Sequence, residues 1–133
     1  MSQENIELHH RVIEVFNRRD LDAFLELMDP DVEFTPYERA MEGLGPYHGH
    51  DDVRVWWENS FEAFPDLGGE YYLVRGWGDT TVANGRLHGT GAGSGAPFDR
   101  QLCTAARWCE GKTVWWYAFV SEAEALETLG LGE

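Results

Sequence analysis

The stretch that decides the fold runs from Gly111 to Glu124 and reads GKTVWWYAFVSEAE. A Gly-Lys turn leads into a strand, Thr113 to Val120, whose two alternating faces are both apolar. A strand with one wet face alternates apolar with polar residues, so both faces of this strand must be covered. We expect one face to line a ligand pocket and the other to meet a second subunit. Ser121, with Glu124 three residues later, predicts a capping box at the start of a short helix.

Working outward from this stretch, the front half of the chain reads as helical and the back half as strands. Hydrophobic periodicity predicts helices over residues 3–18, 21–28 and from Asp51 to the stop at Pro65, and a loop over 37–49. Strands are predicted over residues 32–36, 70–76, 80–90, 97–110 and 113–120. The order of elements indicates one α+β domain, residues 1–133, with a meander sheet and the helices packed on one face.

The composition narrows the class of protein. The net charge of −14 repels phosphate backbones, so we expect no nucleic acid partner. We expect no membrane span, because no apolar run reaches 18 residues, and no signal peptide. Cys103 and Cys109 lie in one strand about 20 Å apart, beyond the reach of a disulfide. Reduced cysteines predict a cytoplasmic protein. The residue spacings suggest no metal site, and we expect no cofactor.

Five short motifs carry a family resemblance. They are Asn17-Arg-Arg-Asp-Leu-Asp-Ala-Phe-Leu, Asp29-Pro-Asp-Val-Glu-Phe, Tyr47-His-Gly-His-Asp, Gly91-Ala-Gly-Ser-Gly and Glu110-Gly-Lys. Their order and spacing resemble the SnoaL-like branch of the nuclear transport factor 2-like superfamily over nearly the whole chain. The resemblance implies a cone, in which a curved antiparallel or mixed sheet wraps around three N-terminal helices and a deep pocket. It also implies a frequent homodimer.

The same resemblance locates the family's acid–base groups on this chain. The tyrosine donor of ketosteroid isomerase falls at Val12, its base at Thr35 and its protonated aspartate at Thr104. The last-strand acid of limonene epoxide hydrolase falls at Ala118, and that of the polyketide cyclases near Ala118 or Ser121. None of these residues can perform the family's chemistry, so no named activity is transferred.

The placement nevertheless predicts which residues face the pocket. Leu102 and Thr104 would lie inside with Arg100 nearer the mouth, and hairpin pairing would add Arg86 and His88. The predicted ligand-binding set is Phe16, Thr35, Tyr37, Trp57, Phe61, Arg86, Arg100, Leu102, Thr104, Trp116 and Ala118. An aromatic lining with a few polar groups is typical of a small-molecule site.

His88 is the candidate for proton transfer, because imidazole titrates near neutrality. Its alternative role is that of a surface strand histidine. Arg86 and Arg100, as cross-strand neighbours, would attract an anion, and a protein acid such as Glu33 or Glu38 is favoured over a ligand carboxylate.

We also considered the positions of the other histidines. His48 either reaches the pocket mouth or belongs to the loop before the third helix. His9 and His10 are expected on the surface of the first helix.

These residues leave three functional hypotheses open. The first is an isomerase, cyclase or hydratase that transfers protons, without a cofactor, on a small apolar ketone, enol or epoxide. The second is a non-catalytic module that binds an apolar or weakly anionic metabolite. The third is a dimer whose pocket is a packing defect. In each case a homodimer is expected through the outer face of the sheet, where Trp115, Tyr117 and Phe119 alternate outward.

Overall fold

The structure, a computed structural model, describes residues 2–131. The helices are Ser2–Asn17 (α1), Leu21–Glu26 (α2), Tyr37–Glu42 (α3), Gly49–Ala63 (α4) and Glu122–Leu129 (α5). The strands are Met28–Thr35 (β1), Tyr47–His48 (β2), Gly68–Trp77 (β3), Thr80–Thr90 (β4), Pro97–Cys109 (β5) and Lys112–Phe119 (β6). The predicted helices and strands are present. The predicted loop over residues 37–49 is wrong in part, because it contains α3 and β2.

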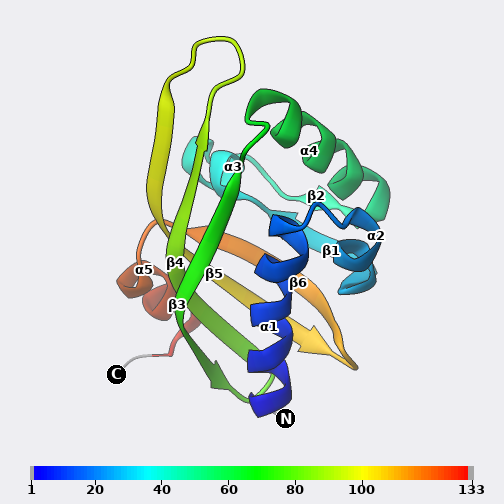
Figure 1. The fold of residues 1–133 in the computed structure, drawn as a ribbon. Helices are drawn as coiled ribbons and strands as arrows, with labels where there is room; N and C mark the ends of the chain where they lie inside the picture. The colour runs from blue at the N-terminus through cyan, green and yellow to red at the C-terminus, as the bar shows by residue number, and fades with distance from the viewer. Residues whose placement is uncertain (1, 132–133) are drawn as a thin grey trace.

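One curved sheet organises the molecule. Its strand order is β2-β1-β6-β5-β4-β3, with β1 and β6 parallel and the other neighbours antiparallel. Helices α1, α2 and α4 lie on one side of the sheet and α5 lies on the other (Figure 1). The predicted α+β class, with a mixed, curved sheet wrapped on N-terminal helices, is therefore confirmed.

The inner face of β6 is covered, and its outer face is covered in part. Trp116 belongs to the main core, which fills the space between the sheet and α1, α2 and α4. Phe119 belongs to a second cluster on the outer face, where it packs with Cys103 and Ala125 of α5. Part of the outer face is thus covered by this chain's own C-terminal helix.

Local signals fix the ends of these elements. The Asp20 carboxylate accepts a hydrogen bond from the Ala23 N–H (3.1 Å) and starts α2, and Ser121 accepts one from the Glu124 N–H (3.1 Å) and starts α5. Glu110 and Gly111 both have positive φ, 52° and 85°, and form the two-residue turn between β5 and β6.

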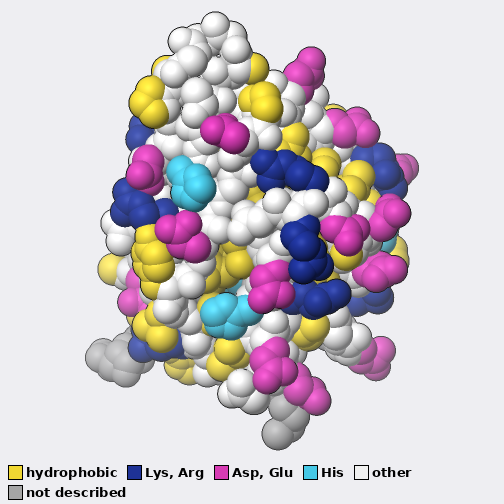
Figure 2. Space-filling view, in the orientation of Figure 1, with side chains coloured by type: hydrophobic (Ala, Val, Ile, Leu, Met, Phe, Trp, Pro, Cys, Tyr) yellow, Lys and Arg dark blue, Asp and Glu magenta, His cyan; other side chains and the backbone are white. Residues whose placement is uncertain are grey.

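Charged side chains are spread over the surface. Figure 2 shows acidic and basic groups interspersed on the face that carries α1 and β3. Among residues 2–131, no helix is both long and apolar enough to cross a membrane.

Candidate functional site

A cavity of about 80 Å³ lies between the helices and the inner face of the sheet. Its walls are mostly aliphatic and aromatic, and include Val12, Phe16, Phe24, Leu102 and Trp116. An outer groove of about 540 Å³ shares part of this lining. The shared residues are Tyr37, Glu38, Trp56, Ser60, Leu67 and Leu87. The enclosed part has room for a small fragment of a ligand, and the groove has room for the rest.

Tyr71 supplies the polar group of one cavity wall, and the local structure of β3 sets the orientation of its side chain. A β-bulge interrupts the β3–β4 pairing, since Tyr71 pairs with Gly85 while Leu73 pairs with Asn84. A Cβ atom at position 85 would collide with the Glu70 carbonyl oxygen and lie 2.9 Å from the Tyr71 ring. Gly85 therefore permits the close approach that places Tyr71 on the cavity wall.

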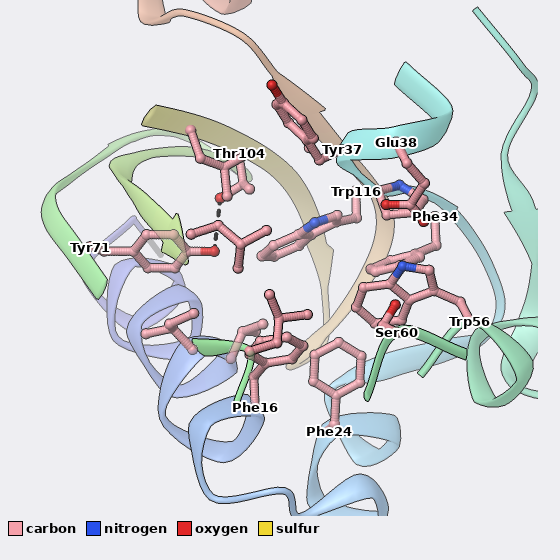
Figure 3. A pocket seen from close by; sticks show the side chains of 17 residues that line it. Phe16, Phe24, Phe34, Tyr37, Glu38, Trp56, Ser60, Tyr71, Thr104 and Trp116 are labelled. Atoms are coloured by element: carbon pink, nitrogen blue, oxygen red, sulfur yellow. Dashed lines mark hydrogen bonds between the residues drawn. The ribbon is translucent and has the colours of Figure 1, made fainter. Parts of the chain in front are cut away.

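A buried hydrogen-bond chain runs behind Tyr71. The Tyr71 hydroxyl lies 3.0 Å from Thr104 Oγ1, which lies 2.9 Å from His9 Nε2 (Figure 3 shows the first contact). His9 Nδ1 lies 2.7 Å from Thr81 Oγ1, and Trp108 Nε1 donates to the same oxygen at 2.7 Å. The chain links α1, β3, β4 and β5 to one point on the cavity.

Burial holds both titratable groups of this chain neutral. His9 is fully buried, and desolvation lowers its pKa from 6.5 to about 3, with a smaller contribution from the nearby His10. Desolvation also raises the pKa of the Tyr71 hydroxyl well above its ordinary range, although the bond from Thr104 opposes the rise. At neutral pH the cavity therefore meets an uncharged phenol backed by an uncharged imidazole.

Glu38 and Trp56 face the cavity from the side opposite Tyr71 (Figure 3). Glu38 is an exposed residue at the rim between the cavity and the outer groove, and its carboxyl group is only partly desolvated. This partial desolvation raises the pKa of the carboxyl group, and its own backbone N–H, the Trp56 indole and Arg39 partly offset the rise. The Trp56 N–H lies close enough to favour the charged carboxylate, but it is buried and makes no hydrogen bond of acceptable geometry. The cavity thus presents a carboxyl group of raised pKa and an indole N–H without a partner.

Six of the predicted residues lie on the cavity wall. They are Phe16, Tyr37, Leu102, Thr104, Trp116 and Ala118. Arg100 lies on the outer groove, as predicted for the mouth, where its guanidinium donates to the Asp99 backbone oxygen and lies over the Phe98 ring. Contact between any of these residues and a ligand stays a prediction.

The predicted inward orientation of His88 and Arg86 is wrong. Thr104 pairs with Ala83, so odd-numbered residues of β4 face the cavity side. The even-numbered ones lie on the outer face: His88 is half-exposed, 3.2 Å from Glu70, and Arg86 binds Asp99 at 2.9 Å. The reason is the connection between β4 and β5. Thr90 pairs with Pro97 across residues 91–96, and an even number of linking residues pairs odd with even positions.

Three other predicted residues lie beside the cavity without lining it. Thr35 pairs with Tyr117 and shares the outer face, while its neighbour Phe34 faces inward. Trp57 and Phe61 pack against Phe16 in the core, and Trp56 takes the position on the cavity. In each case the residue that lines the cavity is the neighbour of the predicted one, which is one position away along a strand or about 100° away around a helix.

The sequence analysis missed His9, Tyr71 and Glu38 as parts of this site. The expectation that His9 is a surface residue is wrong, because it is fully buried. An available signal was its place one turn before Val12 and Ile13 on the apolar face of α1. Tyr71 follows from the bulge, which no local sequence pattern announces. Glu38 lies in the stretch predicted as loop.

A cavity between a cone of strands and N-terminal helices is the arrangement that the sequence resemblance implies. The family model described as the SnoaL-like domain matches residues 9–116, which include His9, Glu38, Tyr71 and Thr104. The chain belongs to the SnoaL-like domain family.

Solved structures repeat this SnoaL-like fold. An NTF2-like protein of unknown function from Burkholderia pseudomallei is 26% identical, with a TM-score of 0.78 over 96% of this chain and 97% of that chain. A protein assigned as a SnoaL-like polyketide cyclase from Jannaschia sp. CCS1 is 22% identical, with a TM-score of 0.75 over 99% and 94%. TerC, co-crystallised with polyporic acid, is 19% identical, with a TM-score of 0.76 over 96% and 98%. Among curated proteins, no sequence matches this chain. At these identities the likeness of the last two shows the fold alone.

Proposed function

We propose that this SnoaL-like protein binds a small, largely apolar molecule with a carbonyl or enol oxygen, and transfers a proton on it without a cofactor. The observation that carries the proposal is the opposition of two groups across one apolar cavity. Tyr71 offers a neutral hydroxyl on one wall, and Glu38 offers a carboxyl group of raised pKa on the other. His88 has no part in the proposal, because it lies on the outer face.

The chemistry is an enolisation. The Glu38 carboxylate takes a proton from the carbon next to the carbonyl group, and the electron pair of that C–H bond forms a C=C bond as the carbonyl oxygen becomes an enolate oxygen. Tyr71 and the unpartnered Trp56 N–H are the candidate donors to this oxygen. Glu38 then returns the proton to another carbon of the enolate, which gives a net isomerisation. Alternatively, the enolate carbon attacks a second carbonyl carbon, and Glu38 gives its proton to the alkoxide that forms, which gives a cyclisation.

The surroundings of Glu38 suit a base of this kind. A carboxylate is a stronger base where burial raises its pKa toward the working pH. Apolar walls also strengthen the hydrogen bond to a developing charge by keeping water away from it. The likeness in fold to proteins assigned as polyketide cyclases is compatible with the enolate chemistry.

Exchange of the α-protons of a ketone with D₂O, followed by NMR, tests the proposal without knowledge of the natural substrate. On a panel of small bicyclic ketones such as 1-indanone and 2-tetralone, we expect exchange above the buffer rate. Glu38→Gln should lower that rate about 10²–10⁴-fold. Glu33→Gln, an exposed carboxylate of β1 outside the cavity lining, is the matched control and should exchange at the wild-type rate.

Two outcomes would redirect the proposal. If ketones raise the melting temperature but their protons exchange at the buffer rate, the protein is a binding module for apolar metabolites. If Glu38→Gln exchanges as fast as the wild type, Glu38 is not the base.

A further inference from the structure

We infer that the hydrogen-bond chain behind the cavity has one fixed direction, so that the Tyr71 O–H donates into the cavity and the site selects ligands that present an acceptor oxygen there. This inference deepens the proposed function and rests on it for the place where the ligand binds. The direction of the chain follows from its donors and acceptors alone.

The direction begins at Trp108, because an indole N–H is a donor and never an acceptor. It donates to Thr81 Oγ1 at 2.7 Å. Thr81 is fully buried, and the one other side-chain partner of its hydroxyl among the described residues is His9 Nδ1, 2.7 Å away. The Thr81 proton therefore goes to Nδ1, and the single proton of the neutral imidazole sits on Nε2.

The rest of the chain follows in order. His9 Nε2–H donates to Thr104 Oγ1 at 2.9 Å, and Thr104 donates to the Tyr71 oxygen at 3.0 Å. The Tyr71 oxygen has then accepted a bond, and its own proton has no acceptor within residues 2–131. Figure 3 shows this hydroxyl directed into the cavity. A ligand oxygen is the partner that it lacks.

The opposite direction leaves a defect. With the proton on Nδ1, Thr81 Oγ1 would accept from both Trp108 and His9, and the Thr81 proton would have no acceptor in a dry interior. A doubly protonated His9 would cause the same defect, and burial also lowers the pKa of His9 to about 3. The direction toward Tyr71 instead leaves the one unmatched proton of the chain at the cavity, where a bound molecule can accept it.

The consequence is a preference between ligands of equal shape. A ketone such as 1-indanone can accept the Tyr71 proton, whereas indole presents an N–H that would face another donor. Losing one such hydrogen bond weakens binding about tenfold. We therefore expect 1-indanone to bind at least about tenfold more tightly than indole, measured by calorimetry.

The tautomer of His9 tests the direction in the wild-type protein. In ¹⁵N-labelled protein, the two ring nitrogens give distinct shifts, and we expect a protonated Nε2 and an unprotonated Nδ1. A protonated Nδ1 would overturn the inference. This measurement needs no ligand and no activity, so its failure is distinguishable from failure of the proposed function.

Thr81→Val tests whether the direction of the hydrogen-bond chain determines the preference for 1-indanone over indole. The substitution keeps the shape of the side chain, lies outside the cavity lining, and removes the group that fixes the tautomer. We expect the preference for 1-indanone to fall to about threefold or less. The control is Thr80→Val, which should keep the preference, because Asp79 is the one hydrogen-bond partner of the Thr80 hydroxyl among residues 2–131. A wild-type protein that binds indole as tightly as 1-indanone, or that binds neither, would contradict the proposed selectivity. A Thr81→Val protein that keeps the wild-type preference would also contradict it.

Discussion

Glu38 lies where the cavity meets the outer groove, and partial desolvation raises the pKa of its carboxyl group above the ordinary 4.5. A general base works only when ionised, so the rate of proton exchange should rise with pH through that elevated pKa. We expect the acidic limb of the pH–rate profile to lie above pH 4.5 and to vanish in Glu38→Gln. A limb at or below the ordinary value would assign the base to another carboxylate.

His9 should make the stability of the fold depend on pH. Its pKa falls from 6.5 in the unfolded chain to about 3 in the folded one, so between these values the unfolded chain binds a proton that the folded chain excludes. The stabilisation is fully present above pH 6.5 and is lost as the pH falls toward 3. Between pH 6.5 and pH 5 the loss should reach about 2 kcal/mol.

Urea unfolding at several pH values measures this dependence on His9. His9→Gln should be less stable at pH 7 and should show a flatter slope between pH 6.5 and pH 5. His88→Gln, which removes a half-exposed histidine outside the cavity, should keep the wild-type slope. Equal slopes in all three proteins would mean that His9 is protonated in the folded state.

At the scale of elements, the β3–β4 pair depends on the bulge opposite Gly85. A Cβ atom there meets the Glu70 backbone, which cannot move without breaking the pairing. Gly85→Ala should lower the free energy of unfolding by about 1–3 kcal/mol, and it should weaken 1-indanone binding by displacing Tyr71. Gly93→Ala, where a Cβ atom meets no neighbour, should change stability by less than about 0.5 kcal/mol. A Gly85→Ala protein as stable as Gly93→Ala would contradict this account of the bulge.

At the scale of the whole molecule, we propose that two copies associate through the outer face of the sheet. The structure changes which side chains can take part. Phe119 lies on the predicted face but is buried beneath α5, while Trp115 and Tyr117 are half-buried. Leu73, which shares this face with Asn84, is 51% exposed. A stable interface needs about 800 Å² from each partner, so it must include residues beyond the predicted aromatic ones.

Light scattering tests the dimer. We expect twice the mass of one chain at tens of micromolar, and Leu73→Glu should shift the mass to that of one chain by placing a charge in the interface. Glu58→Gln on α4 is an exposed control and should leave the mass unchanged. A wild-type protein with the mass of one chain would contradict the proposal.

The sequence by itself determined most of the elements and their order, although not α3 and β2. Asp20 and Ser121 carry their helix-start signals in their own side chains, and the Glu110-Gly111 turn needs only its own backbone. The alternation of β6 also placed Trp116 and Tyr117 on opposite faces of the sheet, and the family resemblance assigned Trp116 to the inner one. These features are local, because the interactions that fix them span a few residues.

The tertiary structure alone decided which groups share the cavity. The even number of residues that connect β4 to β5 places the His88 side chain on the outer face of the sheet. The one extra residue at the bulge in β3 places the Tyr71 side chain on the inner face. His9 became part of the site because two strands, β4 and β5, brought two threonines and Trp108 to its ring. Since side chains alternate along a strand, one residue of register reverses a whole face, and register is fixed by pairing between distant segments.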